Sequence, residues 1–249
     1  MAPLEKKIGL AAEMSAKRFR DIILFWGFGA SGVAGLIYEV VWSRALTNTV
    51  GATTYSFSIL LAAYMAGLAL GGHYGGAYLK HRKDHVVVFG ALQLCTGVFG
   101  LATLYVISNL QTLYGAIFYQ LRGFFYLFTA AQLILVFLIM LVPTTLMGAG
   151  FPVIVEAWSL RVTEIGRNAG NVYSINTWGA VVGALASGFI LVPMAGLRSA
   201  NLTAVSINLA LAFLALLIAG YRRLAVAVLV LFSVTPFIVL PNLPPYLAF

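Results

Sequence analysis

Long apolar runs separated by short polar loops dominate this sequence, and they restrict the fold more than any other feature. Of the 249 residues, 61% are hydrophobic and only 9% are charged, and the mean hydropathy is +0.97. A soluble domain carries about 25% charged residues, so this chain cannot cover itself with a surface suited to water. Each run has roughly the 20 residues that a helix needs to cross a bilayer. The sequence therefore predicts an all-α, polytopic membrane helical bundle of about seven transmembrane helices.

The apolar runs and the loops between them divide the chain into three parts. Residues 1–21 are predicted to be a cytoplasmic N-terminal arm, either amphipathic or disordered, and residues 241–249 a proline-rich C-terminal tail. Residues 22–240 form the predicted transmembrane domain. Its approximate spans are residues 22–43, 54–79, 86–108, 124–154, 169–193, 202–219 and 224–240.

The distribution of basic residues sets the predicted orientation. Most of the 15 Lys and Arg residues fall in the N-terminal arm or in loops on the same side of the membrane, whereas Arg44, Arg122 and Arg198 fall on the other side. Because cytoplasmic loops are enriched in Lys and Arg, we expect a multi-pass protein of the cell (inner) membrane with a cytoplasmic N-terminus. The net charge of +8 then reflects topology and does not predict nucleic-acid binding.

Small residues recur at four-residue spacing in several spans. Such stripes let two helix backbones approach closely, which is how membrane helices commonly pack. A short echo, TTYSFS at the start of the second span and NVYSIN at the start of the fifth, also fits a three-plus-three arrangement of helices. The stripes are Gly27, Ser31 and Gly35 in span one, Gly67, Gly71 and Gly75 in span two, and Gly179, Gly183 and Ser187 in span five.

The fourth span contains Pro143 and Pro152 within the sequence PTTLMGAGFPVI, which predicts a kink or break. Two interpretations remain open. A broken helix would expose backbone groups to a substrate near the middle of the membrane. Alternatively, the groups freed by proline are satisfied by Thr144, Thr145 or a neighbouring helix.

Glu39 is the main candidate site residue, because an acidic side chain inside a membrane span is costly and usually functional. We expect it within about a turn of the outer interface, near Arg44. It is either part of a structural ion pair with Arg44, Arg122 or Arg198, or a ligand or proton site. Asn171, Tyr173 and Asn176 belong to the most polar stretch of any span. They either connect helices or line a polar cavity.

No metal site or cofactor is expected. His73, His81 and His85 lie near one loop, but Lys80, Arg82 and Lys83 are interspersed with them and oppose a cation. Cys95 is the only cysteine, so neither an internal disulfide nor a cysteine-based cluster can form. The only aspartates, Asp21 and Asp84, lie at predicted cytoplasmic edges, so no Ser-His-Asp triad is supported.

Two long motifs resemble a known family. SGVAGLIYEVVWSRALTNTVGATTYSFSILLAAYMAGLALGG (31–72) and GNVYSINTWGAVVGALASGFILVPMAGL (170–197) are similar to the membrane domain of spermidine synthase-like proteins, the fused major facilitator and spermidine synthase proteins. PTTLMGAGFPV (143–153) fits between them. The resemblance implies a bundle like half of a major facilitator. It transfers no catalytic residue, since the glycine-rich loop and the acidic residues of the aminopropyltransferase domain are absent from this sequence.

Two main functions follow as expectations. The first is a noncatalytic membrane module that serves as anchor, scaffold or subunit of a membrane complex, with other membrane subunits or a second copy as partners besides the lipid bilayer. The alternative is a transporter-like protein that moves a small molecule such as a polyamine and works as a dimer. A transporter should contain a cavity lined by Glu39, Asn171, Asn176 or Tyr173, whereas a scaffold should have filled helix interfaces. An enzyme acting within the bundle is a third possibility.

Overall fold

The computed structural model describes residues 2–50, 54–79, 84–109, 123–158 and 165–239, together with a few single residues between these ranges. All regular structure in this part of the chain is helical, as predicted. The helices are α1 (Ala2–Val50), α2 (Thr54–Tyr74) with the π-helical turn η1 (Gly75–Leu79), α3 (His85–Ser108), α5 (Phe125–Trp158), α6 (Ile165–Ala186) with the π-helical turn η3 (Ser187–Leu191), α7 (Val192–Ile218) and α8 (Arg222–Val239).

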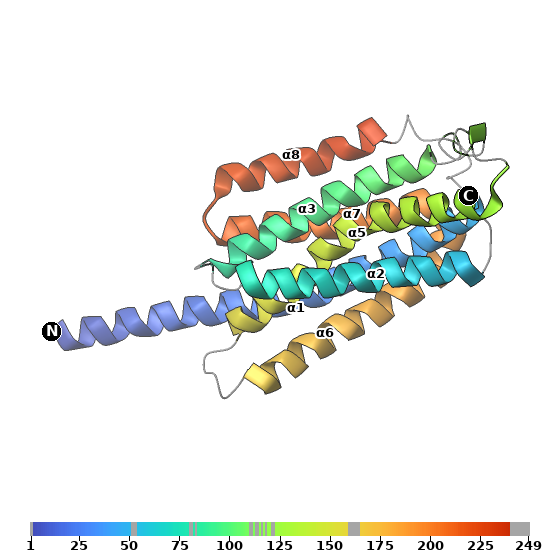
Figure 1. Ribbon diagram of the computed structural model, residues 1–249. Coiled ribbons are helices and arrows are strands. Elements are labelled where there is room, and N and C mark those ends of the chain that lie inside the picture. Colours follow the sequence, from blue (N-terminus) through green and yellow to red (C-terminus); the bar gives the residue numbers. More distant parts are fainter. Residues whose placement is uncertain are drawn as a thin grey trace.

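Successive helices run back and forth along one direction (Figure 1). Gly196, near the start of α7, has non-helical backbone angles (φ 77°, ψ 169°). This positive φ is readily adopted only by glycine. The rest of α7 then returns to the end of the bundle where α8 begins (Figure 1).

Five helical stretches are long and apolar enough to cross a membrane: residues 19–47, 57–79, 85–103, 126–158 and 166–218. The last has 53 residues, which at about 1.5 Å per residue is far longer than a bilayer is thick. It includes Gly196, where the helix is interrupted. The chain is therefore a helical, multi-pass membrane protein.

The predicted N-terminal arm is helical in the structure. α1 begins at Ala2 and continues without a break through residue 21, where the sequence analysis placed a boundary. Its first part extends beyond the other helices (Figure 1). α1 also continues to Val50, seven residues past the predicted end of the first span at residue 43. The predicted C-terminal tail, residues 241–249, lies outside the described residues.

The sequence predicts a kink or a break at the prolines; α5 remains one helix across both, so the helix is not broken there, and the kink stays a prediction. Pro143 cannot donate a backbone hydrogen bond. The hydroxyls of the next two residues bond back to the preceding turn: Thr144 Oγ1 donates to the Met140 carbonyl oxygen (2.7 Å), and Thr145 Oγ1 to that of Leu141 (2.6 Å). These bonds go to the Met140 and Leu141 carbonyls, whereas the carbonyl that loses its donor at Pro143 is that of Ile139, and α5 continues to Trp158.

Close helix pairs form the bundle. α2 packs mainly on α5, α1 on α6, and α3 on α7. The largest core cluster lies around Tyr38 and Trp42 of α1, both fully buried, with stacked rings whose centroids are 5.0 Å apart. Apolar side chains also cover much of the outer surface, as expected for helices that face hydrocarbon.

The small-residue stripes of α2 and α6 lie where backbones meet, whereas Gly27 and Gly35 of α1 meet only side chains. A Cβ atom at Gly71 of α2 would collide with the backbone oxygen of Thr145 on α5. A Cβ atom at Gly183 of α6 would collide with the backbone oxygen of Val33 on α1. Glycine is therefore required at these crossings, because any side chain would force the helices apart.

These two crossings correspond to each other. The separation in sequence between Gly71 and Gly183 equals that between Val33, the partner of Gly183, and Thr145, the partner of Gly71. The same spacing relates Gly67, which meets the Leu141 oxygen, to Gly179, which meets the Gly29 oxygen, and it relates η1 to η3.

The helices thus form two repeats that make one set of contacts. The first repeat is α1, α2 and α3, and the second is α5, α6 and the second part of α7. Because α1 and α5 run in opposite directions (Figure 1), the two repeats are inverted relative to each other. The Tyr-Ser echo noted in the sequence has a different spacing, so the glycine stripes, not the echo, align the repeats.

Candidate functional site

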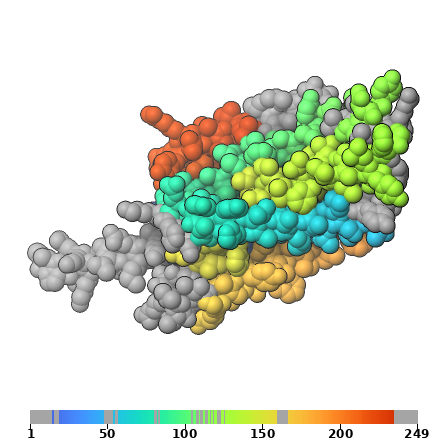
Figure 2. Space-filling view, viewed as in Figure 1, coloured from blue at the N-terminus to red at the C-terminus, as the bar shows by residue number. Residues whose placement is uncertain are grey.

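A cavity of about 560 Å³ lies inside the bundle. Its lining comes from the middle of six helices: α1, α2, α3, α5, α6 and α7. Met65 of α2 and Thr177 and Val181 of α6 are lining residues that are also exposed, so the mouth of the cavity lies between these two helices. Figure 2 shows α2 and α6 on the same face of the molecule.

Glu39 of α1 is the only charged side chain among the described residues that line the cavity; no Lys, Arg or His takes part. It is half-buried. Since α1 continues for eleven residues beyond it, to Val50, Glu39 lies about 16 Å from that helix end.

The predicted ion pairs of Glu39 are not found. Arg44 is exposed and lines a separate pocket of about 720 Å³ beside Gly196. Within the described part of the chain, Glu39 makes neither an ion pair nor a hydrogen bond, either to Arg44 or to Arg198. The third predicted partner, Arg122, lies outside the described residues. The carboxylate therefore faces the cavity without a cation of its own.

Two buried amides also face the cavity. Gln93 of α3 is 6% exposed, and its Oε1 atom has no hydrogen-bond partner. A buried amide oxygen without a partner is unusual and calls for an explanation. Asn208 of α7 is 1% exposed, and its Nδ2 atom donates a 3.2 Å hydrogen bond to the hydroxyl of Tyr38.

Three hydroxyls of the cavity wall donate their hydrogens within the protein. Tyr64 donates to the Gly35 carbonyl oxygen (3.2 Å), Thr96 to that of Leu92 (2.8 Å), and Thr177 to that of Tyr173 (2.8 Å). A hydroxyl that has donated its hydrogen can still accept one. Together with the Glu39 carboxylate and the Gln93 carbonyl, these groups make the cavity rich in acceptors.

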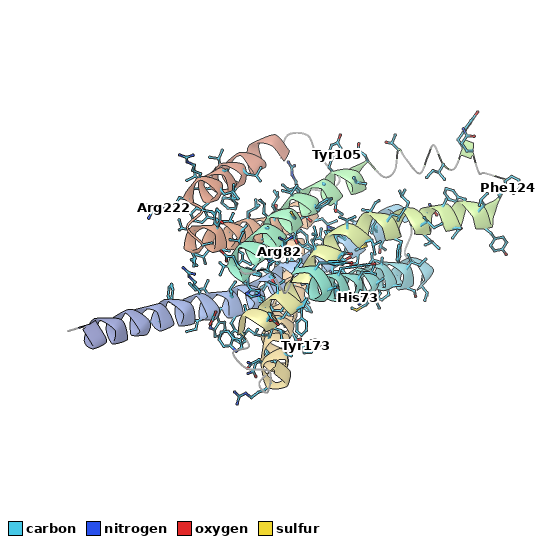
Figure 3. All side chains as sticks on the ribbon, turned by 60° about the vertical axis from the view of Figure 1, so that its left-hand side comes forward. His73, Arg82, Tyr105, Phe124, Tyr173 and Arg222 are labelled. Carbon is cyan, nitrogen blue, oxygen red and sulfur yellow. The ribbon has the colours of Figure 1, made fainter. Side chains whose placement is uncertain are left out.

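One end of the cavity is aromatic. Phe28 of α1 and Phe151 of α5 have ring centroids 6.4 Å apart, and Tyr173 of α6 lines the wall. Figure 3 shows Tyr173 on its helix. Phe28 precedes Glu39 by three helical turns, about 16 Å along α1. The cavity thus has a carboxylate toward one end and aromatic rings toward the other.

Of the predicted site residues, Glu39, Tyr173 and Asn176 line this cavity. Asn171 is exposed on α6 and does not, and Arg44 belongs to the other pocket.

The sequence analysis did not single out Gln93 or Asn208, or Tyr64 on α2. A usable signal existed, since Gln93 and Asn208 are the only amides in their predicted spans.

No group of three potential metal ligands occurs among the described His, Cys, Asp and Glu residues. His81 lies outside the described residues, and His73 is exposed at the end of α2 (Figure 3).

Comparisons with known proteins add no identification: no family model, curated protein or solved structure matches the chain.

Proposed function

We propose that this chain is a transporter-like membrane protein that binds a small organic cation in the cavity of its helix bundle. The observation that supports this most is Glu39, a carboxylate with no cationic partner in a cavity that no basic residue lines. A charge at this depth is costly unless something compensates it. A bound cation would supply that compensation.

The acceptor-rich wall favours the same class of ligand. An ammonium group donates several hydrogen bonds and accepts none. The Gln93 Oε1 atom is available to it, as are the hydroxyl oxygens of Tyr64 and Thr96. Aromatic rings such as that of Phe151 can also attract cations. An anion would find no basic side chain among the described lining residues to balance its charge.

The position of the cavity supports transport rather than static binding. Secondary transporters place their sites near the middle of the membrane, between inverted repeats. Here the lining comes from the middle of both repeats. Several wall residues occupy equivalent positions, among them Thr96 and Asn208, and Tyr64 and Asn176. Opposite tilting of the two repeats would open the cavity to one side and then to the other.

The open mouth supports action as a dimer. Polar groups such as Asn176 and Thr177 lie at or beside a mouth between α2 and α6. Polar groups that face hydrocarbon are unfavourable, and a second copy covering this face would remove the exposure. Seven membrane crossings, a cytoplasmic N-terminus and a likeness to half of a major facilitator belong to the same proposal. We also propose that the chain belongs to the spermidine synthase-like membrane domains.

A noncatalytic anchor or scaffold is the second candidate. Its specific support is α1, whose first part extends beyond the other helices and could hold a partner (Figure 1). The cavity favours the first candidate, because a pure scaffold needs only filled interfaces.

Uptake by proteoliposomes tests the proposal. Radiolabelled butylamine, putrescine and spermidine are offered to vesicles with the wild-type chain, with Glu39→Gln, or with Glu156→Gln. Glu156 is an exposed carboxylate outside the cavity and is the matched control. We expect uptake of at least one amine, a loss of tenfold or more in Glu39→Gln, and no change in Glu156→Gln. Equal uptake by all three proteins and by empty vesicles would contradict the proposal.

A further inference from the structure

We propose that the ligand of this cavity is an amphipathic monocation, an ammonium group with an apolar tail, rather than a molecule with a charge at each end. This inference rests on the proposed function and specifies the class of cation. It follows from the places where the two inverted repeats differ inside the cavity.

The repeats contribute many equivalent positions to the wall. The spacing that relates Gly71 to Gly183 also relates Leu68 to Ala180, Gly72 to Ala184, and Thr96 to Asn208. Both members of each pair line the cavity. The cavity therefore lies on the axis that relates the repeats, and a symmetric wall would have the same chemistry at both ends.

The wall is not symmetric where charge is concerned. The position equivalent to Glu39 of α1 is Phe151 of α5, and both residues line the cavity. The inversion of the repeats places these two residues toward opposite ends. One end thus holds a carboxylate, and the other holds an aromatic ring.

The aromatic end is reinforced by its neighbours. Phe28 lies against Phe151 with ring centroids 6.4 Å apart and is only 4% exposed, and Tyr173 also lines the wall. No described acidic residue accompanies them in the lining. A second ammonium group would lose its water here without gaining a carboxylate, which is unfavourable. An apolar tail would instead gain contact with the rings.

The polar groups between the two ends suit the head of the ligand and the start of its tail. Gln93 is more than nine-tenths buried, lines the cavity, and its Oε1 atom lacks a hydrogen-bond partner. An ammonium group bound to Glu39 has further hydrogens to donate, and the Gln93 oxygen is an acceptor for one of them. An extended eight-carbon amine is about 10 Å long, so it fits within the span of about 16 Å from Glu39 to Phe28 along α1.

Octylamine and 1,8-diaminooctane test the inference, because they differ only in the second ammonium group. Binding is measured by calorimetry on purified full-length protein in detergent. The signal of Glu39→Gln is subtracted to remove partition of the amines into micelles. We expect the wild-type chain to bind octylamine at least tenfold more tightly than the diamine. Equal affinity, or tighter binding of the diamine, would overturn the inference while leaving the proposed cation site intact.

Two variants make the test sharper. Phe151→Glu introduces a carboxylate at the position equivalent to Glu39. This variant should bind the diamine more tightly than octylamine. If this variant does not fold, Phe151→Leu provides the test, since it removes only the ring contact. It should weaken the binding of octylamine by about tenfold and change the binding of the diamine little. An unchanged ratio of affinities in the folded variant would contradict the inference. If neither amine binds the wild-type protein, the proposed function fails with it.

Discussion

Asn208 and Tyr38 are joined by a buried hydrogen bond of 3.2 Å between Nδ2 and the phenol oxygen. Asn208 lines the cavity, whereas Tyr38 is fully buried in the main core cluster against Trp42. The bond therefore connects the wall of the candidate site on α7 to the central packing of α1. It lies between segments that are far apart in the sequence, so it depends on the assembled bundle.

Removing the Tyr38 hydroxyl should destabilise the protein. Tyr38→Phe leaves the Asn208 amide without its acceptor, and we expect the free energy of unfolding to fall by about 1 kcal/mol. Asn208→Leu should act on the same bond, so the double variant should lose less than the sum of the two single losses. Chemical unfolding in detergent measures this, with the exposed Tyr221→Phe as a control expected to show no change. Full additivity would show that the bond is not formed.

Single methyl groups at the helix crossings should separate the helices. At Gly71 and Gly183 an added Cβ would meet backbone atoms of the neighbouring helix, which cannot rotate away. Gly71→Ala and Gly183→Ala should each lower the free energy of unfolding by about 1–3 kcal/mol.

Gly72→Ala and Gly188→Ala are matched controls in the same helical segments, because nothing lies within 4 Å of a Cβ at either position. Thermal unfolding in detergent gives the comparison. Similar melting temperatures for all four variants would contradict the described crossings.

The orientation in the membrane can be tested with cysteines in a Cys95→Ser background. Asp84 and Arg222 lie at one end of the bundle and Thr54 at the other, and all three are exposed (Figure 1). With a cytoplasmic N-terminus, an impermeant maleimide added to intact cells should label Thr54→Cys alone. Asp84→Cys and Arg222→Cys should react only after the cells are opened. The reverse pattern would invert the proposed topology.

The sequence was sufficient to predict an all-helical membrane bundle, because an apolar run of helix length has few other stable solutions in a bilayer. It was also sufficient to find Glu39, since an acidic residue stands out in such a run. A break at Pro143 could not be excluded from sequence, because a proline followed by two threonines is compatible with a broken and with an unbroken helix. The change of chain direction at Gly196 was indicated in the sequence only by the glycine itself.

The residues that line the cavity were harder to predict from sequence. Asn171 and Asn176 belong to one polar stretch, but only Asn176 lines the cavity, because the rotation of α6 about its axis is set by Gly179 and Gly183 meeting α1. Gln93 and Asn208 were overlooked as single amides in apolar spans. The correspondence of Glu39 with Phe151 required the register of the repeats, which the glycine contacts establish and the short Tyr-Ser echo does not.

Access of water to the middle of the bundle tests the central claim most directly. In the Cys95→Ser background, Ala180→Cys places a thiol in the cavity wall, and Leu185→Cys places one on an exposed apolar position of the same helix outside the lining. We predict that a charged, water-soluble methanethiosulfonate labels Ala180→Cys but not Leu185→Cys, and that octylamine slows the labelling only while Glu39 is present. Equal resistance of both thiols, or labelling that no amine affects, would contradict a ligand-binding cavity in this protein.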